Sequence, residues 1–492
     1  MRMYRNFLVV FAVLLFRFLG AQNYQAINGS MYAGSLAPSS NPAGIVHVPY
    51  AWDITPFAFQ IKQSTNAYRI DNFSFLSSPK NAEAVALNGT KKRFVFANQD
   101  LRLLNTRISL NTNAAIAFGA NLRNYLYTTT SNANWQDTSF TLANFLSINT
   151  GNLPLSAEAA GSMWAEFYGS YAQTVYTDGD KILNAGITLK YNRAVAGGHG
   201  RASNVSYIPF PADKPAYSVT TGSLLYGYST NFDGLDSNKT FNENKKTFLQ
   251  NHHYSLGADI GFEYIVLADE DFNNGNEEID EYAYKTKIGI SLMDLGSNKF
   301  AYSSRSSLAI AGLPGITDTL LENKFEGVNS IDKFNDSLQT VSGSFTRLTG
   351  DFYIYQPTRI IINADQHIAG NFFINAELTI PLMPIVSKNS LFIRDMNLLA
   401  LTPRWETKNL GFYFPLLFNN KKQFWAGAAF KLGPVLLGTH HIGNLFAKNT
   451  THSGGLYLAC TIRAGKKYDR QANYPGKKMS SKEKRSLECT SF

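Results

Sequence analysis

The sequence predicts an all-β fold, namely a transmembrane antiparallel β-barrel of about 14–16 strands with an N-terminal plug segment. Three observations support this fold class: an export signal at the N-terminus, long segments that alternate apolar and polar residues, and a low content of charge. Charged residues make up 16% of the chain and aromatic residues 13%. In soluble domains about a quarter of all residues are charged, so this composition favours a surface that faces lipid.

The first 21 residues have the order of a secretory signal peptide. Two arginines precede an apolar run from Phe7 to Phe16, and small residues follow up to Ala21. A retained membrane anchor is the alternative, but a spanning helix needs roughly 20 apolar residues, and Arg17 ends this run at about half that length. We therefore expect cleavage after Ala21 and export to the bacterial outer membrane.

Long alternating segments identify the strands. The clearest are His253–Leu267, Lys181–Arg193 and Tyr282–Met293. A soluble sandwich is the alternative, but its strands average about five or six residues, whereas membrane-crossing strands need about 9–11. Tyrosines such as Tyr254 and Tyr264 mark the ends of the apolar faces, as in interfacial girdles. Further candidates are Ala51–Gln63, Tyr68–Leu76, Leu101–Leu110, Ala114–Tyr127, Met163–Tyr176, Tyr217–Thr230, Tyr302–Ile310, Arg359–His367, Asn371–Ile380, Asn397–Glu406, Leu410–Phe418, Phe424–Leu437 and Gly454–Arg463.

We expect four parts along the chain: a signal peptide (1–21), a plug or hatch segment (22–49), the barrel (50–464) and a basic, disordered tail (465–492). The tail contributes to the net charge of +9. A tail that binds nucleic acid is the alternative, but in an exported protein a solvated tail is the better interpretation, so we expect no nucleic-acid partner. Two cysteines, Cys460 and Cys489, do not make a disulfide framework.

Long polar segments separate some of the strands, notably Thr128–Gly161, Ala194–Ala216 and Ser297–Gly350. Outer-membrane barrels usually keep long loops outside the cell and short turns in the periplasm. If Ala51–Gln63 is the first strand and rises from the periplasm, several long segments fall on the wrong side. Either a further strand such as Arg93–Asn98 belongs to the wall, or the barrel departs from the rule, and the sequence leaves both open.

One hairpin permits a prediction of register. Polar residues fall on odd positions in both Arg359–His367 and Asn371–Ile380, so the numbers of directly paired residues must add up to an even value. This excludes a two-residue turn and predicts a three-residue loop that ends at Gly370, with this glycine in the left-handed conformation. Asn363 would then face Asn375.

Acidic and histidine side chains on the polar faces are candidate lumen-facing residues. They are His253, Asp259, Glu263, Asp365, His367 and Glu377. Asp365 and His367 lie about 6.6 Å apart along one strand, which would suit a barrel hydrolase. The sequence places no serine or second acid to complete such a site. Polar side chains that satisfy one another in the lumen are the better interpretation, and we expect no catalytic residue.

Two patterns could suggest a metal. The acidic loop Asp269–Glu278 is similar to a calcium loop, but its glycine falls one place late for the EF-hand spacing and the closing glutamate is out of place. A solvated acidic loop is therefore favoured. The adjacent histidines of His252-His253 and His440-His441 would point to opposite faces of a strand. We expect no metal site and no cofactor.

Short motifs carry a resemblance to a known family. Ser40-Asn41-Pro42-Ala43-Gly44 resembles the N-terminal hatch of FadL-type long-chain fatty-acid transporters, where an Asn-Pro-Ala segment plugs the lumen, so Asn41, Pro42, Ala43 and Gly44 are the expected plug motif. Ile288–Gly296, Thr402–Glu406 and Leu432–Phe446 resemble an uncharacterised family of bacterial outer-membrane β-barrels. That family is related to FadL-type transporters and to barrel components of type IX secretion. The likeness covers most of residues 30–465, and a short basic tail stands where members often carry an OmpA-like peptidoglycan-binding domain.

The resemblance implies a passive channel or transporter for small hydrophobic molecules, gated by movement of the plug and without enzymatic activity. The alternative is a structural or secretion-associated scaffold of the outer membrane that transports nothing. The expected partners are outer-membrane lipid, a small hydrophobic ligand, and proteins of the cell envelope or of secretion.

Overall fold

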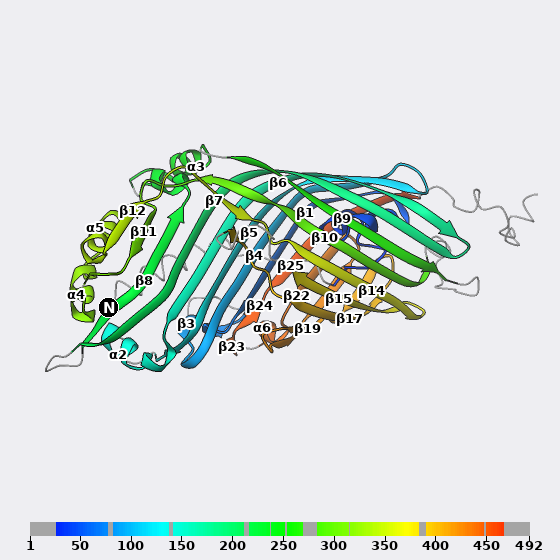
Figure 1. Cartoon of the computed structure of the whole chain (residues 1–492). Coiled ribbons are helices and arrows are strands. Elements are labelled where there is room, and N and C mark those ends of the chain that lie inside the picture. The colour runs from blue at the N-terminus through cyan, green and yellow to red at the C-terminus, as the bar shows by residue number, and fades with distance from the viewer. Residues whose placement is uncertain are drawn as a thin grey trace, which may run out of the picture.

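A closed antiparallel wall of 14 strands encloses the N-terminal segment in the computed structural model (Figure 1). The structure describes residues 26–76, 82–136, 141–210, 216–236, 238–250, 253–268, 283–313, 315–382, 390–446 and 449–466. The predicted antiparallel β-barrel is confirmed, and its 14 strands lie within the predicted range.

The wall begins and ends with strands that pair with each other. In chain order it consists of β1 (Tyr50–Thr65), β4 (Gly89–Ser109), β5 (Ala114–Trp135), β6 (Leu155–Asp178), β7 (Lys181–Phe210), β9 (Tyr254–Leu267), β10 (Tyr284–Ala301), β14 (Arg359–Ala369), β15 (Phe372–Pro381), β17 (Leu398–Glu406), β18 with β19 (Leu410–Tyr413, Leu416–Asn419), β20 with β21 (Phe424–Ala426, Ala428–Leu432), β22 (Val435–Thr439), and β24 with β25 (Ser453–Gly454, Leu456–Lys466). Trp52 of β1 lies opposite Ile108 of β4 on one side and Ala464 of β25 on the other, which closes the barrel.

The wall has its apolar face outside and its polar face inside. In β9, Leu256 is 75% exposed and Phe262 is 46% exposed, whereas Asp259 and Glu263 of the same strand are buried. A soluble sandwich would bury the apolar face instead. An apolar outer surface is stable only in lipid, so the fold is that of an outer-membrane-type barrel.

The first wall strand begins, and the last one ends, at the end of the barrel that carries the short turns. Tyr50 of β1 pairs with Lys466 of β25, and the turns after β4, β6, β14 and β21 contain at most four residues. The long connections are all at the opposite end, except for residues 268–283, most of which fall outside the described ranges. Because outer-membrane barrels usually carry their long loops outside the cell, we assign the end with the long connections to the outside.

The observed wall strands explain why several long segments fell on the wrong side of the membrane in the strand order predicted from the sequence. Tyr68–Leu76 is not a wall strand, because β2 (Tyr68–Phe73) forms a separate small sheet with β3 (Glu83–Ala86) and β23 (Asn449–Thr451). Arg93–Asn98 does belong to the wall, as part of the long strand β4.

The predicted loop Ala194–Ala216 is wrong, because β7 continues to Phe210 as a strand of 30 residues. At about 3.3 Å per residue such a strand extends roughly 100 Å, far beyond what a bilayer requires. Residues 155–161 of the predicted loop Thr128–Gly161 likewise belong to β6. In these two stretches, polar composition marked parts of the wall that project from the membrane, whereas α2 (Leu142–Ser147) and η4 (Thr150–Asn152) do lie in a connection between wall strands.

The register predicted for the β14–β15 hairpin is wrong by two residues. Asn363 pairs with Glu377, and Asp365 pairs with Asn375. The turn has two residues. Residues of equal parity can still pair across this turn, because a register shift between residues 367 and 369 of β14 leaves one residue of that strand without a direct partner. Gly370 does adopt the predicted left-handed conformation, with a φ of 53°.

Shorter strands and helices lie at the outer end of the barrel. They are β8 (Ala216–Tyr228), β11 (Ser307–Ile310), β12 (Ser344–Arg347), β13 (Asp351–Tyr355), β16 (Leu391–Phe392), α2 (Leu142–Ser147), α3 (Phe241–Phe248), α4 (Asp318–Phe325), α5 (Ile331–Val341), α6 (Gly443–Phe446), η4 (Thr150–Asn152) and η5 (Thr230–Gly234). Among the described residues, no helix is long and apolar enough to cross a membrane.

Several predictions concern residues outside the described ranges. These are the signal peptide 1–21, the first residues of the segment 22–49, the acidic loop Asp269–Glu278, and nearly all of the tail 465–492 with Cys489. Cys460 is a free cysteine in β25.

Candidate functional site

The N-terminal segment, residues 26–49, lies inside the barrel and is almost entirely buried. It contains two short 3-10 helices, η1 (Gly34–Ser39) and η2 (Pro42–Ile45). Asn41 begins the second of these helices: its side chain accepts a hydrogen bond from the backbone of Ala43, and Pro42 occupies the first helical position. Asparagine and proline are preferred at these two positions, so the sequence itself forms the turn.

Polar groups from strands all around the wall hold this segment. Asn28 donates to Glu377 of β15 (2.8 Å), and Ser30 donates to Glu406 of β17 (2.9 Å). Further hydrogen bonds to the wall include Arg107 to the Ile45 carbonyl (2.7 Å), Arg463 to the Tyr32 carbonyl (2.8 Å), Ser291 to the Ser40 carbonyl (2.5 Å), Asn41 to the Phe262 carbonyl (2.9 Å) and the backbone N–H of Ser35 to Asp53 (2.5 Å). Because donors and acceptors come from opposite sides of the wall, the segment crosses the interior.

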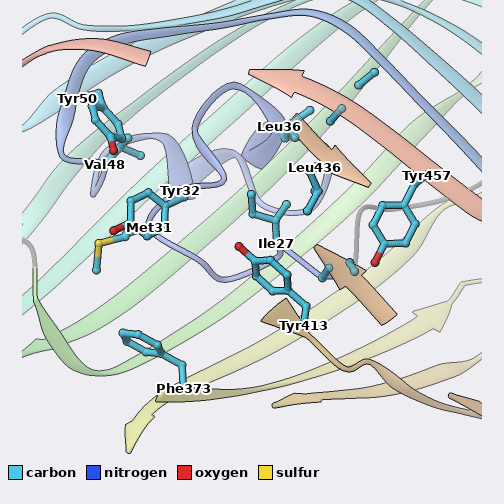
Figure 2. Close-up of a cluster of buried hydrophobic side chains, with 14 of the residues drawn as sticks. Ile27, Met31, Tyr32, Leu36, Val48, Tyr50, Phe373, Tyr413, Leu436 and Tyr457 are labelled. Atoms are coloured by element: carbon cyan, nitrogen blue, oxygen red, sulfur yellow. The ribbon is translucent and has the colours of Figure 1, made fainter. Parts of the chain in front are cut away.

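An apolar cluster adds to these hydrogen bonds. Figure 2 shows side chains of the segment, including Ile27 and Tyr32, among Phe373, Tyr413 and Leu436 of the wall. The ammonium group of Lys431 lies 3.7 Å from the centre of the Tyr32 ring, within the range of a cation–π contact. Burial raises the pKa of Tyr32 well above its usual value, so its hydroxyl stays neutral at physiological pH.

Three glycines form a seat for the Asn41–Gly44 motif. Gly186 of β7 faces Gly261 of β9, and Gly289 lies in the next strand, β10. A Cβ at residue 186 would lie 2.6 Å from the backbone of Pro42 and Ala43, and one at residue 289 would lie 2.7 Å from the Asn41 amide. The glycine-lined face of three neighbouring strands therefore allows the motif to contact the wall backbone directly, and we call it the glycine seat.

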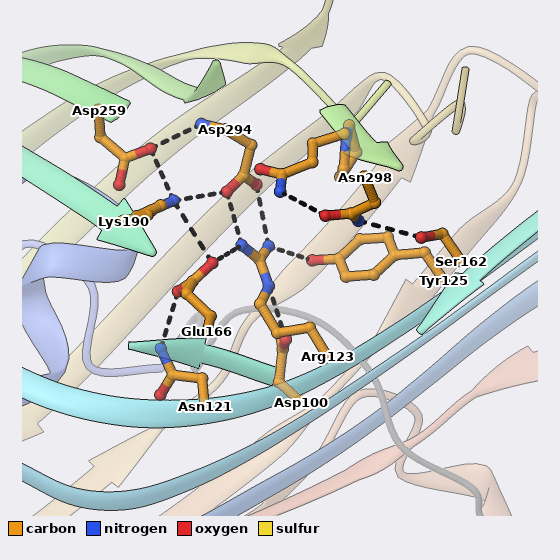
Figure 3. A network of polar contacts seen from close by, with 12 residues as sticks. Asp100, Asn121, Arg123, Tyr125, Ser162, Glu166, Lys190, Asp259, Asp294 and Asn298 are labelled. Atoms are coloured by element: carbon orange, nitrogen blue, oxygen red, sulfur yellow. Dashed lines mark hydrogen bonds and ion pairs between the residues drawn. The ribbon is translucent and has the colours of Figure 1, made fainter. Parts of the chain in front are cut away.

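A buried network of charges centres on Asp294, next to η1 (Figure 3). Arg123 binds Asp294 with two nitrogens, at 2.6 and 2.9 Å, and Lys190 binds it at 2.7 Å. Arg359 is a third cation paired with Asp294. Asp294 has a φ of 58°, an uncommon conformation that aspartate tolerates better than most residues, and it lies where the β9–β10 register shifts.

The cations of this network have further acidic partners. Arg123 contacts Asp100 (3.1 Å) and Glu166 (3.0 Å), and Lys190 contacts Asp259 (2.7 Å). Three cations therefore meet four carboxylates, all of them buried. Such a network is stable only when each charge keeps its partners, because an unpaired charge in a dry interior is costly.

A second network lies near Glu406. Arg404 is fully buried and binds Asp365 (2.6 Å) and Glu406 (2.9 Å). The hydroxyl of Tyr413 donates to Glu406 (3.1 Å). Since Ser30 of the N-terminal segment also donates to Glu406, this network connects the segment to the wall.

The structure does not bring the six predicted lumen residues into one site. Asp259 belongs to the Asp294 network, and Asp365 belongs to the Arg404 network. Glu377 binds Asn28, and Glu263 lies near Gly44 and 3.9 Å from Lys287. The last two residues are at the ends of strands: His253 directly precedes β9, and His367 lies near the turn after β14.

The Asp365–His367 pair considered as a hydrolytic site has other contacts. Asp365 accepts hydrogen bonds from Arg404, from Asn375 (3.0 Å) and from the Tyr284 hydroxyl (3.2 Å). His367 donates to the carbonyl of Gly370 (2.8 Å). None of these contacts is to a nucleophile, so they give no support to catalysis. In the described part of the chain, no three His, Cys, Asp or Glu side chains are grouped to hold a metal ion.

Sequence reasoning assigned no role to the residues at the centre of both networks: Arg123, Lys190, Asp294, Arg359, Arg404 and Glu406. Asp294, Arg404 and Glu406 nevertheless lie in two of the motifs that carry the family resemblance. A signal was present for some of them. Lys190 stands on the polar face of the alternating segment Lys181–Arg193, and a charge there must find a partner inside the barrel.

Small cavities lie between the segment and the wall. One cavity, of about 30 Å³, lies between η1 and the Asp294 network. Another, also of about 30 Å³, lies beside Asn41 and Gly44 and is lined by Glu263, Lys287 and Ser291. Each has room for only a few water molecules, and polar groups line both.

A closed wall, an apolar outer face and a polar, filled interior define the class of the protein as an outer-membrane β-barrel. Residues 42–440 match the family of unknown function DUF5723, and the chain belongs to this family. No curated protein is significantly similar in sequence.

Several solved structures match most of the chain at low sequence identity. The TodX deltaS2S3 mutant monoaromatic hydrocarbon channel has 11% identity and a TM-score of 0.40, over 88% of this chain and 95% of that one. The toluene transporter TbuX of Ralstonia pickettii has 11% identity and a TM-score of 0.37, over 87% and 94%. A FadL homologue of Pseudomonas aeruginosa has 8% identity and a TM-score of 0.22, over 91% and 99%.

Proposed function

We propose that the protein is a passive transporter of the outer membrane whose N-terminal segment, residues 22–49, is a displaceable plug. The observation that carries this proposal is the way in which residues 26–49 are held. The segment crosses the interior, yet it is not a strand of the wall and is attached by side-chain hydrogen bonds, apolar contacts and the glycine seat. Such contacts can be broken and remade without unfolding the barrel.

Small hydrophobic molecules are the proposed cargo. On the outer side of the Asp294 network, buried aromatic and aliphatic side chains form a second apolar cluster, which includes Tyr125, Trp164, Phe300, Phe352 and Met396. This cluster would receive an apolar molecule from outside the cell. The charged network and the seated segment would then stop it, so passage requires displacement of the plug.

Uptake by liposomes tests this function. Protein from which residues 22–48 are deleted should take up a small aromatic hydrocarbon faster than intact protein does, and a charged solute of similar size is the control for selectivity. No uptake by either form would refute transport. Faster uptake of the charged solute alone would refute the hydrophobic cargo and assign the polar lumen as the path.

A scaffold without transport is the second candidate, and the filled interior favours it. Buried ion pairs such as Arg123–Asp294 and Arg404–Asp365 stiffen the barrel and leave little open space. In this role the outer projection around β7 would bind proteins of the cell envelope or of a secretion machine, with type IX secretion as one case. Crosslinking in intact cells followed by purification should then recover a partner in stoichiometric amount, whereas a transporter should be recovered alone.

A further inference from the structure

The connection between β8 and β9 lies beside the lipid-facing surface of the wall. At the outer end of this surface, Tyr191 of β7 and Tyr254 of β9 stack with their ring centres 5.1 Å apart, and both are about half exposed. Tyrosines in this position mark the boundary between the apolar band and the headgroups. Figure 1 shows α3, from the same connection, on the outside of the wall and apart from α4 and α5.

The connection is a small folded unit. Phe232 of η5 packs against Phe248 of α3 (5.4 Å between ring centres), and the Asn231 side chain donates to the Phe248 carbonyl (2.5 Å). Thr240 and Glu243 form a capping box that starts α3. Its exposed side chains therefore have a fixed orientation.

A side-chain hydrogen bond attaches the end of α3 to the wall at the level of the tyrosines. The guanidinium group of Arg193 donates to the carbonyl of Leu249, the C-cap residue of α3 (2.8 Å). Arg193 is the direct cross-strand partner of Tyr254. The C-terminal end of α3 is thus fixed next to the boundary of the apolar band.

α3 turns a stripe of two apolar residues with a lysine between them away from the protein. Phe241, Lys245 and Leu249 follow each other at intervals of four residues and share one face of the helix. Phe241 is 75% exposed, as much as the lipid-facing Leu256. In contrast, Phe334 of α5 packs against Phe325 and Tyr226, so the helices at the tip cover their aromatic side chains.

We propose that α3 is an interfacial anchor whose stripe lies in the headgroup region of the outer leaflet. The occupant is lipid, because the stripe continues the lipid-facing surface of β7 and β9. Phe241 and Leu249 enter the boundary of the acyl chains, and the stem of Lys245 lies along it while the ammonium group reaches headgroup phosphates. The anchor fixes the depth of the barrel in the membrane and the position of its outer projection.

Spin labels test this placement in vesicles of phosphatidylcholine and phosphatidylglycerol. Phe241→Cys is labelled with a nitroxide in protein whose two native cysteines are serine, and collisions with oxygen are compared with collisions with a water-soluble nickel chelate. Leu256→Cys is the lipid-exposed reference, and Gln339→Cys on the exposed face of α5 is the water-exposed reference. The ratio of oxygen to nickel collisions at residue 241 should be several-fold above that at residue 339 and should approach that at residue 256.

A ratio at residue 241 equal to that at residue 339 would overturn the proposal. Shielding from both reagents would also overturn it, because the stripe would then be covered by protein. Lys245→Cys, on the same stripe, repeats the measurement if Phe241→Cys fails to fold, and it should give an intermediate ratio.

Discussion

Replacing Gly186 by alanine places a methyl group where the Asn41–Gly44 motif contacts the wall. The new Cβ would lie 2.6 Å from the backbone of Pro42 and Ala43, whereas ordinary contacts of a Cβ begin at 3.4 Å. The motif must therefore retreat by about 0.8 Å, and it is backbone, not a flexible side chain, that has to move. Overpacking of this kind costs about 1–3 kcal/mol.

If that cost acts on the seated segment alone, the equilibrium between seated and displaced segment shifts about 5- to 150-fold. Hydrogen exchange of the amides in residues 26–49 should accelerate within this range in Gly186→Ala, while exchange in the wall stays unchanged. Gly169→Ala in β6 is the matched control, because a Cβ there meets nothing within 4 Å. Unchanged exchange of the segment in Gly186→Ala would refute the seat, and equal acceleration in Gly169→Ala would show a general loosening of the barrel.

Three other variants test the interior and the outer surface. Asp294→Asn should lower the free energy of unfolding by about 3–5 kcal/mol, because buried cations lose a charged partner while the backbone conformation is kept; urea unfolding in detergent measures this. Asn28→Ala removes the 2.8 Å hydrogen bond to Glu377, whose other donor, Asn363, lies at 3.5 Å. This loss should favour release of the segment by about 1–3 kcal/mol, seen as faster proteolysis near the N-terminus. Phe262→Arg should destabilise the barrel in lipid by about 2–4 kcal/mol, whereas Gln339→Arg on α5 should leave stability unchanged.

Alternation predicted the long wall strands because every second side chain of a membrane strand must face lipid. The segments His253–Leu267 and Lys181–Arg193 both lie in the wall for this reason. The same pattern misassigned Tyr68–Leu76, since a small sheet outside the membrane also alternates. Alternation shows that a strand has two different faces, but it does not show which sheet the strand joins.

Register and ion pairs were beyond the sequence for different reasons. Parity correctly placed the polar residues of β14 and β15 on one face, but the bulge near Ala369 moved the pairing by two residues. No local sequence pattern predicts such a bulge. Arg123 and Asp294 are 171 residues apart, and only closure of the barrel brings them together.

The Asn41–Gly44 motif was singled out from the sequence by its resemblance to a hatch motif, and a short motif can carry such a resemblance because its turn is local: an asparagine cap and a proline form it. Its seat could not be predicted. Gly186, Gly261 and Gly289 come from three strands, and their proximity depends on the register of all three.

Single-channel conductance in planar bilayers tests the central claim, that residues 22–49 close the barrel, most directly. Intact protein should be almost non-conducting, because the cavities beside the segment hold only a few waters. Protein that lacks residues 22–48 should open stable channels of uniform conductance, and Gly186→Ala should open them intermittently. Equal and negligible conductance of all three proteins would contradict the plug and would favour the scaffold.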